Sequence, residues 1–366
     1  MHASRRLLVA LVLMGACAVA VAGTANGTSA SRTTGWAIRD LGTLGGNTSA
    51  ATAINNRGQL VGWSTTRSGA RHAFLWEDGR MRDLGTLGGR QSGALALNER
   101  GQIVGWSMRR DGRKQATLWQ QGTIRGLREP GSAGSVATGI NEQGDVSGYW
   151  WRERDDDSAY DARHCRGPGG TCGFGGLWSK GVFGRFGSIG SFANAVNDES
   201  VVVGSNSVFH DLPGRTMLWR EGGNHFTWFQ DAPGVGYGVG PASRNAPALP
   251  WPAVVGWTLS KGRRQASLWY GDYREPPVIL GTLGGPTSVA YGINSRSQIV
   301  GESSTKGGGA HAFVWRKGTM RDLGTLPGGH GSSAAGTDDR GRIVGRSGTR
   351  GGHVHAVLWT QASKSP

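Results

Sequence analysis

Two stretches near the start of the chain are almost identical: Arg39-Asp40-Leu41-Gly42-Thr43-Leu44-Gly45-Gly46 and Arg82-Asp83-Leu84-Gly85-Thr86-Leu87-Gly88-Gly89. The same words return as Leu280-Gly281-Thr282-Leu283-Gly284-Gly285 and Arg321-Asp322-Leu323-Gly324-Thr325-Leu326. Self-similarity at a regular spacing is the sequence signature of a repeat architecture. The fold of this chain is therefore set by a repeat.

Two markers count the units. The first is a glycine in a Val-Gly-type pair, found as Gly62, Gly105, Gly148, Gly204, Gly256, Gly301 and Gly345. The second is a tryptophan that ends a short apolar run, found as Trp76, Trp119, Trp178, Trp219, Trp269, Trp315 and Trp359. Both markers count seven units, of which the third and fifth are longer and more degenerate.

Each unit reads as four short strands. In the first unit these are Ala51–Ile54, Gln59–Ser64, His72–Trp76 and Met81–Leu84. The turn after the first strand, Asn55-Asn56-Arg57-Gly58, suits a tight type I connection in which the Asn side chain bonds its own backbone. No segment after the N-terminal apolar run shows a sustained helical period. Four-stranded units at this spacing predict an all-β fold, the β-propeller.

The phase of the repeat predicts how the propeller closes. After the N-terminal apolar run, the chain begins with a lone fourth strand, Trp36–Leu41, and ends after a third strand, His355–Trp359. An N-terminal strand that completes the last blade would close the ring and remove a reactive sheet edge. We therefore predict a seven-bladed propeller over residues 36–359, followed by a C-terminal tail at 360–366.

The repeat also explains an unusual composition, 65 glycines and 15 tryptophans in 366 residues. Small residues such as Ala51 and Ala94 suit inner strands that crowd the axis. A glycine inside a strand usually marks the close approach of another group. We expect the closing tryptophans to form the core, each lying across a strand-2 glycine of a neighbouring blade.

One polar position recurs in the third strand, occupied in chain order by His72, Gln115, Phe174, Arg215, Gln265, His311 and His355. Glutamine and arginine in this position favour hydrogen bonding, for example to a neighbouring turn, over metal binding. Asp40, Asp83 and Asp322 each follow an arginine in a fourth strand. We interpret these aspartates as paired residues at the blade edge and not as catalytic carboxylates.

The N-terminus is typical of export. Arg5 and Arg6 precede an apolar run from Leu7 to Ala22, which predicts a signal peptide over residues 1–22, cleaved after Ala22 or Ala25. A flexible segment over 23–35 then leads to the propeller. Cys17 after Met14-Gly15-Ala16 offers the alternative of a lipoprotein, although the apolar run continues past it. We expect an extracellular protein with no membrane span.

The chain is strongly basic. It has 40 Lys and Arg against 25 Asp and Glu, and removal of Arg5 and Arg6 leaves 38 − 25 = +13. Such a charge suits an anionic cell-wall polymer or polysaccharide. The arginines are nevertheless scattered, which favours a generally basic surface and argues against a specific nucleic-acid site.

The repeated words resemble the bacterial extracellular HAF repeat family, named for its His-Ala-Phe triplet. The triplet stands at His72-Ala73-Phe74 and His311-Ala312-Phe313, with His355-Ala356-Val357 in the last repeat. The similarity spans roughly Trp36 to Trp359 and is loose in the third to fifth repeats. It implies secretion and a repeat fold. It implies no established activity, so it supplies no catalytic residues.

The site candidates lie where loops should emerge on one face of the ring. These loops join strand 4 to the next strand 1 and strand 2 to strand 3, and the longest, Trp151 to Gly176, lies in the third repeat. We take as ligand-binding candidates Trp150 and Trp151 at the root of this insertion, Asp156, Tyr160 and Asp161 within it, and Arg90 and His330 in the Leu-Gly-Gly loops.

Several of these residues have a plainer interpretation. Trp150 also fits a simple continuation of strand 2, as Trp63, Trp106 and Trp257 mark that strand elsewhere. Cys165 and Cys172 suit a disulfide in an oxidising compartment; zinc with His164 would lack a fourth ligand. Asp155-Asp156-Asp157 lacks the alternating spacing of a calcium loop. We expect no metal and no cofactor.

Two functions follow from these features. The favoured one is a secreted, monomeric, non-catalytic binding or scaffold protein for a cell-surface polymer, a polysaccharide or an extracellular protein. The alternative is a secreted polysaccharide-active enzyme, a lyase or glycosidase, with acids supplied by the third-repeat insertion. A propeller fold alone does not decide between them.

Overall fold

A computed structural model describes residues 35–127, 129, 131–153, 172–186, 190–206, 215–220, 227–228, 234–240, 252–270 and 275–362. All regular structure in these residues is β-strand. None of the described segments forms a helix long and apolar enough to cross a membrane.

The strands form seven four-stranded antiparallel sheets, called blades 1 to 7 in chain order. Blade 1 contains β2 (Gly45–Ile54), β3 (Leu60–Thr66), β4 (Arg71–Glu77) and β5 (Arg80–Asp83). Blade 2 contains β6 (Gly88–Leu97), β7 (Ile103–Arg109), β8 (Lys114–Gln120) and β9 (Thr123–Gly126). Blade 3 contains β10 (Gly134–Ile140), β11 (Val146–Arg152), β12 (Cys172–Ser179) and β13 (Val182–Phe186).

The remaining blades repeat the plan. Blade 4 contains β14 (Ser191–Val196), β15 (Val201–Asn206), β16 (Arg215–Arg220) and β17 (Thr227–Trp228). Blade 5 contains β18 (Gly234–Val239), β19 (Val254–Ser260), β20 (Arg263–Trp269) and β21 (Val278–Gly281). Blade 6 contains β22 (Gly284–Ile293), β23 (Ile299–Thr305), β24 (Ala310–Arg316) and β25 (Thr319–Asp322). Blade 7 contains β26 (Ser332–Thr337), β27 (Ile343–Gly348), β28 (Val354–Gln361) and β1 (Trp36–Asp40).

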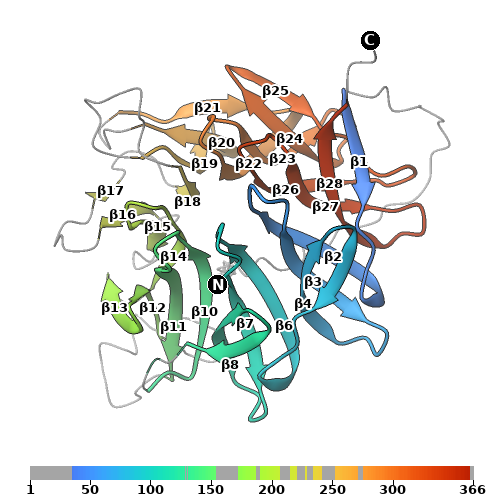
Figure 1. Cartoon of the computed structure of the whole chain (residues 1–366). Helices are drawn as coiled ribbons and strands as arrows, with labels where there is room; N and C mark the ends of the chain where they lie inside the picture. The colour runs from blue at the N-terminus through green and yellow to red at the C-terminus, as the bar shows by residue number, and fades with distance from the viewer. Residues whose placement is uncertain are drawn as a thin grey trace, which may run out of the picture.

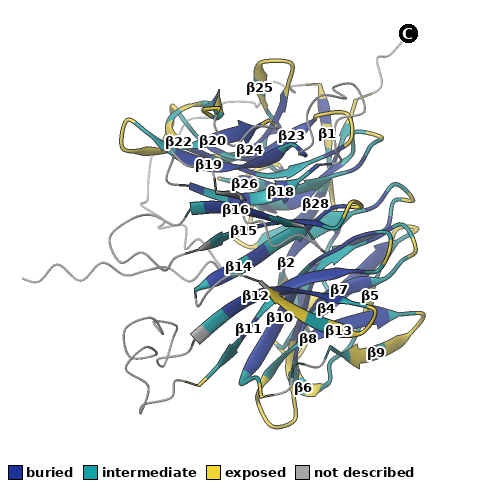
Figure 2. Cartoon of the chain, turned by 90° about the vertical axis from the view of Figure 1, so that its left-hand side faces the viewer, coloured by how far each residue is buried: buried dark blue, intermediate teal, exposed yellow. Residues whose placement is uncertain are grey.

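The blades stand side by side in a ring, which confirms the predicted seven-bladed β-propeller (Figure 1). The first strands of neighbouring blades lie next to each other around the axis. For example, Thr52 Oγ1 in β2 donates to the Ala94 carbonyl in β6 at 3.1 Å. Buried residues run along the strands, and exposed ones gather in the outer hairpins such as β9 and β25 (Figure 2).

The N-terminal strand closes the ring, as predicted. Strand β1 pairs antiparallel with β28, from Trp36 opposite Gln361 to Asp40 opposite Val357 (Figure 1). The pairing carries β28 two residues beyond the predicted end at Trp359. Blade 7 therefore takes its outermost strand from the opposite end of the chain, and no blade is left with an open seam.

The turns have the predicted chemistry. Asn55 Oδ1 accepts from the Gln59 backbone N–H at 3.0 Å, which closes the turn between β2 and β3. Its amide also donates to the Asn98 carbonyl of the next blade at 3.1 Å. Asn98 and Asn141 donate in the same way, at 3.0 and 3.1 Å, to the carbonyls of Asn141 and Asn197. The asparagine turns therefore link adjacent blades near the axis as well as forming turns.

The closing tryptophans form the core, as predicted, but they pack against aliphatic side chains. Trp119 of blade 2 clusters with Val61, Ala73 and Leu75 of blade 1. Trp359 of blade 7 clusters in the same way with Val300, Ala312 and Val314 of blade 6. The alanine of each His-Ala-Phe triplet is fully buried because the next blade's indole covers it. Burial of a Trp removes some 150–250 Å² of surface from water, roughly 4–6 kcal/mol before entropy costs.

We predicted that a closing tryptophan would crowd each strand-2 glycine. That prediction was wrong, because the nearest group is the backbone of the first strand in the same blade. A Cβ on Gly105 would collide with the carbonyl oxygen of Gly93 and lie 2.9 Å from Ala94 Cα, in the first strand of the same blade. Among the corresponding glycines of the other blades, only Gly148 has a tryptophan among its three nearest neighbours. The register shifts at this point, between Ala94 and Ala96. The bulge brings the two backbones together, and only glycine leaves room.

The recurrent histidines and aspartates bond to one another. His72 Nδ1 lies 2.7 Å from Asp83 Oδ2, and His311 Nδ1 lies 2.7 Å from Asp322 Oδ2. In blade 7, His355 reaches Asp40 of the N-terminal strand at 2.8 Å. The other oxygen of Asp83 accepts from the Gly85 N–H at 2.7 Å, at the start of the following loop. These positions are structural, which confirms both the hydrogen-bonding role and the blade-edge pairing.

We predict that Gly105→Ala lowers the free energy of unfolding by about 2–4 kcal/mol, because the new methyl group would overlap the β6 backbone. Urea unfolding measures this change. Gly307→Ala is the matched control: Gly307 lacks a positive φ, and its Cβ would approach only Thr305 Oγ1, at 3.8 Å. Equal midpoints for both variants would contradict the steric explanation.

Candidate functional site

Two kinds of loop meet on one face of the propeller, as expected. The start of β2 pairs with the end of β3, where Gly45 lies opposite Thr66 and Leu44 forms a bridge to the same residue. Leu87 and Arg109 form the same bridge in blade 2. The Leu-Gly-Gly loops and the loops between strands 2 and 3 therefore share what we call the loop face.

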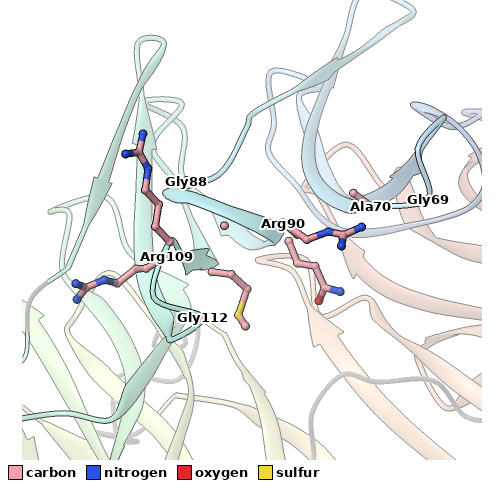
Figure 3. Close-up of a pocket in the computed structure, with 10 residues that line it drawn as sticks. Gly69, Ala70, Gly88, Arg90, Arg109 and Gly112 are labelled. Atoms are coloured by element: carbon pink, nitrogen blue, oxygen red, sulfur yellow. The ribbon is translucent and has the colours of Figure 1, made fainter.

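A cavity of about 530 Å³ opens on the loop face between blades 1 and 2. Its walls come from three segments: residues 69–70 of the loop between β3 and β4, residues 88–91 at the start of β6, and residues 108–110 and 112 at the end of β7 and in the loop that follows (Figure 3). Glycine forms much of the wall, so the backbone is open to a ligand. A Cβ on Gly88 would lie 2.7 Å from Arg110 Cγ, so this glycine gives the arginine room to lie across the wall.

The cavity is basic. Arg90, Arg109 and Arg110 line it, and the Arg90 and Arg109 side chains project from its two sides (Figure 3). Arg109 pairs with Asp111 at 3.1 Å, in a pair about half exposed on both sides. That pair offsets one of the three charges. Arg90, a candidate from sequence, therefore stands in a concave, positively charged surface that Arg109 and Arg110 complete.

A stack of cations and indoles crosses from blade 1 to blade 2. The Arg71 guanidinium carbon lies 4.0 Å from the centre of the Trp63 ring and 5.3 Å from that of Trp106. Lys114 Nζ lies 4.5 Å from the same Trp106 ring. A Cβ on Gly93 would lie 3.1 Å from Trp106 Nε1. Because glycine has no Cβ, this indole can lie across the innermost strand, β6.

Both cations of this stack pay a desolvation cost. Burial lowers the pKa of Arg71 to about 10, far enough above neutral pH that the guanidinium stays charged. Burial, and then the charge of Arg71, lower the pKa of Lys114. The sequence analysis did not identify Arg71 and Lys114 as a pair of neighbouring cations. Its signal was a basic residue two places before the alanine of the triplet, combined with a tryptophan directly after the strand-2 glycine.

The third-repeat insertion lies mostly outside the described residues. Asp156, Tyr160, Asp161 and Cys165 fall within 154–171, and Cys172 is described only as the first residue of β12. Their proposed ligand contacts and the proposed disulfide therefore remain predictions. Elsewhere in the described chain, no three His, Cys, Asp or Glu side chains converge as a metal site.

Trp150 is a core residue. Only 7% of it is exposed, and its ring stacks on Phe174 at 4.7 Å and 23°. Its predicted alignment with Trp63 and Trp106 was one residue out of register. Tyr149 follows the strand-2 glycine Gly148, and Trp150 takes the position of Ser64 in blade 1. Its burial favours the core alternative for Trp150, and its ligand role stays a prediction.

Blade 3 thereby replaces a polar set with an aromatic one. In blade 1, Ser64 lies opposite His72, which bonds Asp83. The register of blade 3 places Trp150, Phe174 and Arg185 in these positions. Arg185 sits 5.0 Å over the Phe174 ring, a cation–π contact where the other blade has a His–Asp pair.

Trp151 and His330 keep surface positions. Trp151 is half-buried beside Tyr149, with ring centres 6.2 Å apart, and its indole lies over Gly134. His330 is exposed on the loop that leads into β26. It shares the loop face with Arg90, but blade 1 separates the two. The structure therefore does not gather the sequence candidates into one site.

The comparisons with known proteins concern the fold alone. The sequence matches no model of a protein family, and no curated protein is significantly similar to it. The structure is similar to a puromycin-hydrolyzing peptidase of Mycobacterium tuberculosis, with TM-score 0.56 and 10% identity over 92% of this chain and 54% of the peptidase. An acylaminoacyl peptidase of Pyrococcus horikoshii gives TM-score 0.55 and 10% identity over 89% of this chain and 54% of that one.

The chain thus spans about half the length of these peptidases. It is also similar to the β-propeller domain of the Trilobed protease of Pyrococcus furiosus, with TM-score 0.50 and 11% identity over 74% of this chain and 82% of that domain. That domain is described as having an open velcro topology. In the present chain, β1 closes the ring on β28.

We predict that Trp150→Ala lowers the free energy of unfolding by about 3–5 kcal/mol, since it removes a buried ring and leaves a cavity against Phe174. Trp151→Ala, at the neighbouring half-buried position, should cost clearly less. Denaturant unfolding of both variants provides the measurement. A Trp150→Ala protein as stable as wild type would contradict the core assignment.

Proposed function

We propose that this protein is a secreted, non-catalytic propeller of the HAF repeat type that binds an anionic cell-surface polymer through its loop face. The basic cavity between blades 1 and 2 carries the proposal. It is concave, with a volume of about 530 Å³, and lined by three arginines, one of which pairs with Asp111. Arginine is the side chain best suited to carboxylate and phosphate groups.

The charge of the whole chain supports the same ligand. The net charge of +15, or +13 without residues 1–22, attracts polyanions over distances set by the ionic strength. Arg90, Arg109 and Arg110 meet at this cavity, whereas Arg80 and Arg82 line a smaller one together with the carboxylates Glu77 and Asp78. Long-range attraction would bring the polymer to the protein, and the cavity would fix where it binds.

Replacing Arg90, Arg109 and Arg110 together with glutamine should weaken binding to polygalacturonate or polyphosphate by about tenfold or more. Surface plasmon resonance at low and high salt measures the effect, and salt should weaken wild-type binding because these side chains are solvent-exposed. Dextran serves as the neutral control polymer.

The matched control variant removes three other exposed arginines, Arg80, Arg82 and Arg125, from strands β5 and β9. It loses the same charge and should keep most of the affinity. Equal losses in both variants would mean that net charge alone drives binding and would contradict a site at the cavity. Release of reducing ends or unsaturated products by the wild type would favour the polysaccharide-active enzyme instead.

Export is the second part of the proposal, and the N-terminal sequence supports it. Expressed with its full N-terminus in a bacterial host, the protein should accumulate outside the cytoplasm with a new N-terminus at Gly23 or Asn26. N-terminal sequencing of the exported protein tests this. An intact Met1 in the exported fraction, or retention of the protein in the cytoplasm, would contradict it.

A further inference from the structure

The stack of Trp63, Arg71, Trp106 and Lys114 places two cations on one indole. Arg71 and Lys114 come from equivalent positions in adjacent blades and lie 5.3 and 4.5 Å from the centre of the Trp106 ring. A cation–π contact stabilises one cation on a ring. A second cation on the same ring is opposed by the charge of the first.

Nothing in the described chain neutralises this pair. No described carboxylate forms an ion pair with Arg71 or Lys114, and the buried Arg71 Nε has no hydrogen-bond partner. A buried charged donor left unpaired is costly. Burial, and after it the charge of Arg71, lower the pKa of Lys114, in agreement with a repulsion between the two cations. Clusters of this kind, strained by like charges and burial, are typical of binding sites.

In blade 5, the positions equivalent to Arg71 and Trp63 hold one cation and one indole, with no second described cation on the ring. Arg264 lies 4.9 Å over the ring of Trp257, in the register positions of Arg71 and Trp63. This is a single cation on a single indole, which packing within one blade explains. Packing within one blade therefore accounts for Arg71 on Trp63, but not for the meeting of Arg71 and Lys114 on Trp106.

We infer that Arg71 and Lys114 form a binding site for an oxyanion: a carboxylate, phosphate or sulfate group. The guanidinium offers a planar pair of donors and the ammonium a point charge, a combination that suits such a group. Both cations are half-buried, so the site should be less sensitive to salt than the exposed cavity arginines. Neither cation lines the cavity, so this inference stands apart from the proposed polymer site.

The test measures the melting temperature of the full protein in phosphate, sulfate or chloride at constant ionic strength. Phosphate and sulfate should raise the wild-type melting temperature above its value in chloride, because they bind the folded state. Lys114→Gln should weaken phosphate binding by about tenfold or more. In chloride alone, the same variant should be as stable as wild type or more stable, since it removes one of two like charges.

A purely structural stack gives the opposite pattern. Lys114→Gln would then destabilise the protein in chloride, and phosphate would shift both proteins equally; either result overturns the inference. The control Arg264→Gln removes an equivalent cation from blade 5 and should leave the phosphate response intact. A loss of the response in this control would also overturn the inference.

Two further measurements distinguish this site from the polymer site and identify the source of the anion. The triple glutamine variant at Arg90, Arg109 and Arg110 should keep the wild-type phosphate response; losing it would overturn the assignment to Arg71 and Lys114. Polymer binding by Lys114→Gln then identifies the ligand. Weakened binding would show that the polymer supplies the anionic group. Unchanged binding with a lost phosphate response would identify a free ion, and both results support the site.

Discussion

The packing of each third-strand tryptophan against the preceding blade is the interaction on which the rest of the structure depends. A blade is one repeat unit that cannot bury its apolar face alone, so it depends on the blades stacked beside it. Trp119 covers Val61, Ala73 and Leu75, and the same arrangement recurs from blade to blade. Because every blade needs the next one, the first also needs the last. Trp76 of blade 1 accordingly packs against Val344 and Ala356 of blade 7.

Ring closure follows from this requirement. Strand β1 completes blade 7, so Asp40 can bond His355 across 315 residues of chain. Hydrogen bonds such as those of the asparagine turns repeat from blade to blade. They hold neighbouring blades together and satisfy the polar groups that form them. Several side chains that differ between repeats lie at the loop face. Arg90, Arg110, Arg71 and Lys114 all lie in blades 1 and 2.

Much of the fold could be predicted because periodicity and phase survive in the sequence. The number of blades, the closing strand, the tryptophan core and the Asn55 turn all follow from repeated words. Less was predictable where a repeat departs from the pattern. In blade 3 the sequence Ser147-Gly148-Tyr149-Trp150 hides the register, and Trp150 was misaligned by one residue. The reason for Gly105 was missed too, since a bulge beside a carbonyl leaves no mark in the sequence.

The site was less predictable than the fold for a related reason. Sequence spacing shows which residues share a position in the repeat, but not which of them reach across to the next blade. Arg71 and Lys114 are 43 positions apart and look like two ordinary basic residues. Only the ring geometry places both on the Trp106 indole.

The sequence by itself determined the architecture, because the repeat, its period and its offset ends allow only one closed arrangement of strands. Tertiary structure decided which charges meet. Contacts between blades depend on how far side chains extend over a neighbouring sheet, and on glycines such as Gly93 that let an indole lie flat. Such contacts have no counterpart in local sequence, so the basic cavity and the cation pair could be recognised only once the blades were assembled.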